Sequence, residues 1–287
     1  MIPNNNFSVL PWYTDIQLQD WRKAYAYGEV YPLFTLQNTV LPFQIVRQTR
    51  ANSISSVQVY KKDGTLYENI TSRMIETGLQ VKRYQAYGYD VIVYYGLLPV
   101  MNTQPQGQYY AVLSDGVQTW YSDVWTVVND ISPYMKIEWY DHHDMVYDGG
   151  RVVYDGVMFR NYVYLIAELG KPDYKYEEEG EERDGLFFAE KRTNEKQFKF
   201  TILAPEYLCD ALAVARLADV IKVTDKYGRE YLCDTFLATP KWQEQGNLAS
   251  VEIEFETPVV AKNIGRGYTI GTGGDFNNDY NNDFNNQ

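Results

Sequence analysis

The chain has 287 residues, enough for two domains, and its 38 acidic and 26 basic side chains give a net charge of −12. This acidity argues against a protein that grips nucleic acid, because affinity for phosphates comes largely from lysine and arginine. The 27 tyrosines and 6 tryptophans favour half-buried β surfaces, and no apolar run approaches the roughly 20 residues that cross a bilayer. The composition predicts a mainly β protein without a membrane span.

An arm rich in aromatic residues is predicted over residues 1–45, where prolines rule out a continuous helix or a central strand. No secretory signal opens the sequence, so synthesis in the cytoplasm is expected. Exposed aromatic rings must be buried somewhere, and we expect the arm to dock either on its own domain or on a neighbouring subunit. The assembly-interface candidates in this arm are Trp12, Tyr13, Trp21, Tyr31 and Phe34.

Short strands separated by turn signals, with no helix between them, predict an antiparallel β-sandwich over residues 46–129. Asp63-Gly64 and Asp115-Gly116 are typical of tight turns between such strands. The pattern is that of an immunoglobulin-like or fibronectin-like domain, an architecture that implies no chemistry by itself. The expected strands are 56–61, 65–67, 79–84, 89–95, 108–113 and 119–128.

A second domain, α+β in class, is predicted over residues 130–264, behind a linker at 129–133. A helix is expected after Pro205, because apolar residues from Tyr207 to Ala218 recur at helical spacing. The alternating strand that ends at Glu256 is expected to be an exposed edge that meets the next subunit, with Phe255 as an interface candidate. The other expected strands are 134–139, 162–167, 186–188, 198–202, 220–224 and 231–236.

A run of acidic residues lies within the polar stretch between Gly170 and Gly185. Like charges in a run usually form an exposed, self-repelling loop, and the run lacks the spacing of a calcium-binding loop. The acidic-loop candidates, which would repel DNA if they faced a channel, are Glu177, Glu178, Glu179, Glu181 and Glu182.

Residues with catalytic potential are sparse. His142 and His143 are the only histidines, and adjacent strand residues point to opposite faces, so the pair is a poor metal site. Without another histidine or a nucleophile elbow, we expect no enzyme, no metal and no cofactor. Cys209 and Cys233 are expected to be free thiols, the ordinary state in a reducing compartment.

The aromatic surplus also permits a different class of function, the binding of carbohydrate on a host surface by the N-terminal sandwich. Rings such as Trp12, Tyr13, Trp120 and Trp125 would then stack on sugar faces. Aromatic residues that alternate along strands more often form the core and cross-strand pairs.

The last segment, residues 265–287, closes with three copies of Asp-aromatic-Asn-Asn. Such a segment cannot bury enough apolar surface to order by itself, so another chain would have to hold it. Its assembly candidates are Phe276, Tyr280 and Phe284.

Several runs of the second domain resemble tail-assembly proteins of tailed bacteriophages and prophages of gut bacteria. These runs are Tyr164–Tyr174, Ala204–Leu208, Tyr231–Asp234 and Pro240–Gln243. The order of strands, helix and hairpin is similar to the tail-tube fold of tube, distal tail and baseplate hub proteins, in which one helix flanks two packed sheets. Distal tail proteins generally place this domain first, whereas here it follows the sandwich.

The resemblance implies a structural virion protein of a phage tail or tail tip. It would form a homo-oligomeric ring, with six as the expected number of subunits, and would connect the tail tube to neighbouring tail proteins. Neither a catalytic residue nor specific nucleic-acid binding is implied. The expected location is the virion tail.

Overall fold

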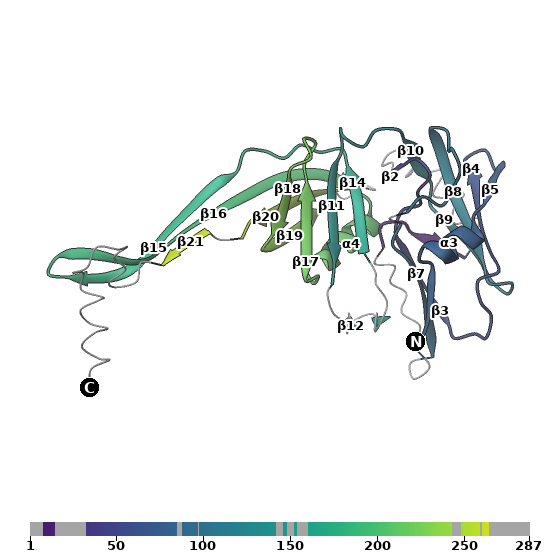
Figure 1. The fold of residues 1–287 in the computed structure, drawn as a ribbon, viewed down its shortest axis with the longest axis horizontal. Helices are drawn as coiled ribbons and strands as arrows, with labels where there is room; N and C mark the ends of the chain where they lie inside the picture. The colour runs from purple at the N-terminus through teal and green to yellow at the C-terminus, as the bar shows by residue number, and fades with distance from the viewer. Residues whose placement is uncertain are drawn as a thin grey trace, which may run out of the picture.

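The computed structural model describes residues 8–14, 33–84, 88–96, 98–141, 146–147, 152–153, 160–242, 248–258 and 260–263. The described chain is mainly β, as the composition predicts, with several sheets and two short helices. The N-terminal sheets lie at one end of an elongated molecule, a pair of sheets lies in the middle, and a long hairpin projects from the other end (Figure 1).

The N-terminal half contains a seven-stranded sheet and a three-stranded sheet. All the predicted strands of this half are present, although the last one is divided in two at Asp123. The seven-stranded sheet contains β1 (Trp12–Tyr13), β2 (Leu33–Leu36), β4 (Ser56–Lys61), β5 (Leu66–Asn69), β8 (Gly107–Ser114), β9 (Thr119–Ser122) and β10 (Trp125–Val128). The three-stranded sheet contains β3 (Phe43–Gln48), β7 (Tyr89–Tyr94) and β6 (Gln80–Tyr84), with β7 in the centre.

The described parts of the predicted N-terminal arm dock on the chain's own core. Strand β1 pairs with β9, and β2 runs parallel to β10. Val9, Leu10, Leu33 and Leu41 are buried. The sheets of residues 46–129 therefore include strands from residues before 46.

One prediction for this half is wrong, because the helix α3 (Thr71–Thr77) lies between β5 and β6. Its seven residues bury only Met74, so no repeating apolar face marks it in the sequence. Gly78 ends the helix at a φ of 123°, a conformation that favours glycine.

Two sheets and a helix form the second half. The first sheet has the order β14 (Arg160–Leu165), β11 (Met135–Tyr140), β17 (Val220–Thr224) and β18 (Glu230–Cys233). The second has the order β15 (Asp173–Arg183), β16 (Leu186–Ala204), β20 (Ala249–Glu256) and β19 (Thr235–Lys241), and β21 (Val260–Asn263) also pairs with β16. A separate ribbon joins β12 (Val146–Tyr147) to β13 (Val152–Val153). The predicted helix is present as α4 (Glu206–Ala215) and contacts β19 and β20.

The expected edge strand is internal, which corrects the prediction made for Phe255. Strand β20 pairs with β16 on one side and β19 on the other, and alternate residues such as Val251, Ile253 and Phe255 are fully buried. The alternation correctly predicts a strand, but the order of strands in a sheet is set by contacts distant in sequence, which alternation does not reveal.

The two halves share one hydrophobic core. The Tyr162 hydroxyl of β14 donates a hydrogen bond to the Gly96 carbonyl at 2.9 Å. The rings of Phe34 and Tyr134 pack with centroids 4.4 Å apart. The middle sheets, from which the long hairpin projects, are thus packed directly against the N-terminal half.

Candidate functional site

The most distinctive feature of the molecule is the arm, which we define as residues 173–197 of the β15–β16 hairpin. Its two strands pair from Asp173 opposite Gln197 to Arg183 opposite Leu186. From Gln197 to Ala204, β16 instead pairs with β20, so this half of β16 anchors the arm in the middle sheets. The arm extends far beyond those sheets (Figure 1).

The acidic residues 177–182 lie on strand β15, which corrects the prediction of a loop. The opposite strand supplies cations that reduce the repulsion between these carboxylates. Arg192 Nε lies 2.8 Å from Glu178 Oε1, and Lys191 Nζ lies 3.4 Å from Glu179 Oε1. Exposed ion pairs contribute about 0–1 kcal/mol each, so they permit a strand here more than they stabilise it.

The tip of the arm is a tight turn. Asp184 and Gly185 both have positive φ, 53° and 76°, as the two central residues of a type I′ turn require. Near the tip, the pairing register shifts between Glu179 and Gly180. A Cβ on Gly180 would lie 2.1 Å from the carbonyl oxygen of Phe188, so only glycine fits this close approach.

Large apolar side chains are exposed at the tip. Leu186, Phe187 and Phe188 are exposed by 64%, 53% and 52%. The face of β16 that carries Phe198 in the core continues along the arm, where Tyr174 and Tyr176 are exposed on β15. Successive strand residues point to opposite faces, so apolar groups are exposed on both faces of the tip, and exposed groups of this size often mark an interaction surface.

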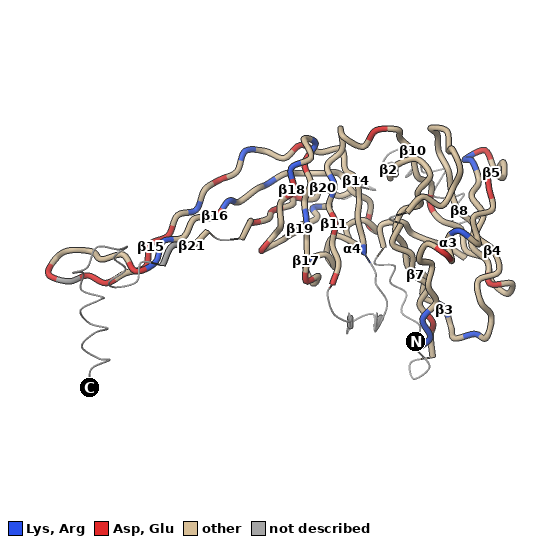
Figure 2. The backbone as a smooth tube through the Cα atoms, viewed as in Figure 1, with Lys and Arg blue, Asp and Glu red and all other residues tan. Residues whose placement is uncertain are grey.

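The outer part of the arm is acidic as well as apolar. Residues 177–192 contain seven acidic and three basic residues, a net charge of −4. Acidic positions gather towards the tip, and basic ones lie farther along the arm (Figure 2). Among the described residues, the outer edge of β15 pairs with no strand. The arm thus combines an unpaired edge, exposed rings and negative charge.

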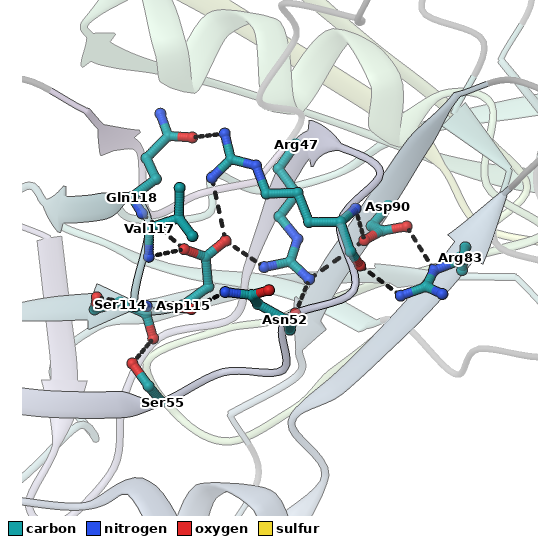
Figure 3. A network of polar contacts seen from close by, with 11 residues as sticks. Arg47, Asn52, Ser55, Arg83, Asp90, Ser114, Asp115, Val117 and Gln118 are labelled. Atoms are coloured by element: carbon teal, nitrogen blue, oxygen red, sulfur yellow. Dashed lines mark hydrogen bonds and ion pairs between the residues drawn. The ribbon is translucent and has the colours of Figure 1, made fainter.

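A second candidate is the buried polar cluster around Arg47, at the end of the molecule opposite the arm. Arg47 Nη1 lies 2.5 Å from Asp115 Oδ2, and Arg47 Nη2 lies 3.3 Å from Asp90 Oδ2. The side chains of all three residues are at most 1% exposed. Arg50 and Arg83 add further contacts from the periphery (Figure 3).

This cluster is structural in character. Asp115 Oδ1 accepts hydrogen bonds from the backbone N–H groups of Val117 and Gln118, which fixes the turn between β8 and β9. Burial opposes ionisation of Asp115, but these hydrogen bonds and Arg47 outweigh it and lower the pKa of the carboxyl. The carboxylates are committed to internal partners, so the cluster joins the two N-terminal sheets and offers no group to a substrate.

A surface hollow of 480 Å³ beside β19 and β20 also offers no reactive group among its described lining residues. Glu254 and Glu256 line it and pair with Lys199 and Lys175. Cys233 lines it too, but burial raises the pKa of this thiol to about 12, which leaves almost no thiolate at neutral pH.

Most of the aromatic residues singled out in the sequence that fall within the described residues are buried and thus unavailable to a partner. Trp12 and Phe34 are buried, Phe255 is fully buried, and Tyr13 is half-buried. Trp120 and Trp125, proposed as sugar platforms, are also buried. The candidates Trp21, Tyr31, Phe276, Tyr280 and Phe284 lie outside the described residues.

The remaining candidates add no chemical site within the part of the chain that the structure describes. His142 and His143 lie outside the described residues, within which no group of His, Cys, Asp and Glu side chains is arranged to hold a metal ion. Cys209 and Cys233 are both free, the first buried and the second half-buried. None of the helices in the described part of the chain is long and apolar enough to span a membrane.

The sequence reasoning missed the apolar tip. The signal was present, because Leu186-Phe187-Phe188 directly follows an Asp-Gly turn and a charged strand. The pattern predicts only that residues 186–188 form a strand. The exposure of these side chains follows from the length of the hairpin, which carries them away from the body.

Comparisons with known proteins assign no family to this chain. It matches no protein-family model, and the search of curated proteins finds no significant match.

Proposed function

We propose that this chain is a structural protein of a phage tail or tail tip. It assembles as a ring, with six subunits expected, and joins the tail tube to neighbouring tail components. The observation that carries the proposal is the arm, which projects from the body with exposed Leu186, Phe187 and Phe188 at its tip. In a monomer these apolar side chains would stay exposed to water, so the surface is best explained by contact with another chain.

The shape of the molecule also favours assembly. The arm leaves one end, and its contact residues cannot reach their own N-terminal half at the other end (Figure 1). Contacts between different surfaces of successive copies generate a closed ring or an open filament. Two packed sheets with α4 beside them also fit the fold implied by the resemblance to tail-tube proteins.

Carbohydrate binding is less well supported as the function of the N-terminal half. It requires aromatic faces open to the solvent, and Trp12, Trp120 and Trp125 are exposed by at most 7%. The expectation that the acidic residues of β15 face a DNA channel stays a prediction, because it depends on the geometry of the assembled ring.

An arm deletion tests the proposal. Tyr176 and Asn194 face each other in the hairpin, so residues 177–193 can be replaced by an Asn-Gly turn. Light scattering and electron microscopy should show rings of the whole chain, and the shortened chain should be a monomer that still unfolds in one cooperative thermal transition.

A milder variant separates the tip from the rest of the arm. Phe187→Ser with Phe188→Ser should weaken assembly, whereas Leu66→Ser, which alters an exposed apolar residue on β5, should not. A whole chain that stays monomeric at all concentrations, or an arm deletion that assembles normally, would overturn the proposal.

A further inference from the structure

We propose that the unpaired edge of β15 in one copy pairs with the outer edge of β6 in the next copy, as an added strand of the three-stranded N-terminal sheet. This inference deepens the proposed function and rests on it, because it names the surface that receives the arm. The proposed pairing involves the backbone edges of β15 and β6. The apolar residues at the tip of the arm stay available for contact with a different surface.

Strand β15 presents an edge that selects its partner by charge. Among the described strands, β15 pairs with β16 alone, so no described strand takes up the backbone N–H and C=O groups along its other edge. Residues 177–182 contain five glutamates and no basic residue, a charge of −5. Two such edges repel each other, so β15 cannot pair with β15 of another copy, whereas a basic strand is attracted.

Strand β6 has the complementary properties. It pairs only with β7 among the described residues, so its other edge is open. Lys82 and Arg83 give it a charge of +2, and none of the other described edge strands (β1, β2, β3, β5, β12, β13, β14, β15, β18, β19 and β21) exceeds +1. The Arg83 side chain is 49% exposed, and the apolar side chain of Val81 is 41% exposed.

The faces of the two strands also agree. Successive residues of a strand point to opposite faces, so Lys82 and Arg83 lie on opposite faces of β6. On β15, Glu177 and Glu179 lie on one face and Glu178 on the other. Antiparallel pairing with Arg83 opposite Glu177 places Lys82 opposite Glu178, so each cation then meets a carboxylate on its own face, as cross-strand pairing favours.

The position of the two edges excludes pairing within one chain. The arm and the three-stranded sheet lie at opposite ends of the long axis (Figure 1). Each copy can thus offer its arm to the next copy and receive an arm from the previous one. Such a head-to-tail contact repeats from one copy to the next, and the copies form a ring when the last one contacts the first.

Two charge-reversed proteins test this pairing. The arm variant carries Glu177→Lys, Glu181→Lys and Glu182→Lys, which changes the charge of residues 177–182 from −5 to +1 and retains the pairs of Glu178 with Arg192 and Glu179 with Lys191. The β6 variant carries Gln80→Glu and Lys82→Glu, which changes β6 from +2 to −1 and retains the contact of Arg83 with Asp90.

Each variant alone should be a folded monomer, because its arm and its β6 edge then carry like charges. An equimolar mixture should assemble, since the reversed arm meets the reversed β6 and the natural arm meets the natural β6. A single chain with all five substitutions should also assemble. Lys61→Glu, a reversal of an exposed lysine on β4, serves as the control and should assemble as the natural chain does.

The inference is overturned if the β6 variant assembles as the natural chain does, or if the mixture and the five-substitution chain both stay monomeric. If the arm deletion abolishes assembly but the β6 variant does not, the arm contacts another surface and the proposed function stands. If the natural chain itself never assembles, the proposed function fails first. Light scattering at low and high salt measures the assembly of each variant and of the mixture. High salt should weaken the contact.

Discussion

Arg47 and Asp115 form a direct ion pair across 68 residues of sequence, with 2.5 Å between Nη1 and Oδ2. The same guanidinium contacts Asp90 at 3.3 Å on the neighbouring strand β7. One buried cation thus compensates two buried carboxylates and ties the three-stranded sheet to the turn between β8 and β9. The receiving edge that we propose for the arm belongs to this three-stranded sheet.

We expect Arg47→Met to lower the free energy of unfolding by about 3–5 kcal/mol, because it leaves two buried carboxylates without their shared cation. Arg50→Gln removes a charge that is 25% exposed and should cost less than about 1 kcal/mol. Urea unfolding followed by circular dichroism measures both. A change within 1 kcal/mol for Arg47→Met would show that the cluster can be replaced by apolar packing.

The same cluster predicts a loss of stability in acid. The pKa of Asp115 is lower in the folded chain than in the unfolded chain, so its stabilising contribution is complete above the unfolded value of about 3.9. That contribution is lost as the pH falls from there through the folded pKa. The melting temperature should therefore drop below pH 4, and Asp115→Asn should show a smaller drop over the same range.

The elements predicted well from sequence are those whose pattern is local. The spacing of apolar residues after Pro205 marks α4, and the alternation from Val251 to Glu256 marks β20. The turn at Gly228 places the β17–β18 hairpin for the same reason. Each of these features depends on residues only a few positions apart.

The candidate site depended on information that is not local. The acidic run of β15 is a strand because it pairs with β16, whose cations such as Arg192 reduce the repulsion between its carboxylates, and the internal position of β20 depends on β19 pairing along its other side. The exposure of Phe187 follows from the length of the hairpin. These features depend on contacts between residues that are distant in the sequence, which a local pattern does not reveal.

The hydrogen bond from Tyr162 to Gly96 predicts how strongly the halves are coupled. Tyr162→Phe leaves the Gly96 carbonyl without this donor at a buried site, so we expect a loss of about 1–3 kcal/mol. Thermal unfolding should remain a single transition if the shared core keeps the halves together. Two separate transitions in the natural chain would contradict that coupling.

The two thiols should be unreactive while the chain is folded. Burial raises the pKa of Cys209 to about 11 and that of Cys233 to about 12. The thiolate, which is the reactive form, is then about a thousandth or less of either residue at pH 8. Alkylation followed by mass spectrometry should find little modification in buffer and modification of both thiols in guanidinium chloride, and fast labelling of the folded chain would contradict this burial.

Gly180 predicts a variant that damages the arm without damaging the body. Gly180→Ala places a Cβ 2.1 Å from the Phe188 carbonyl oxygen, so the strands must separate near the tip. Hydrogen exchange should quicken over residues 180–189 and assembly should weaken, while the free energy of unfolding changes by less than about 0.5 kcal/mol, since the arm adds nothing to the core. Gly185→Asn is the matched control, because asparagine tolerates the positive φ of this turn and the site has open space around it. If Gly180→Ala assembles like the natural chain despite faster exchange at the tip, then the geometry of the tip is not what a partner recognises, and the contact must lie closer to the root of the arm.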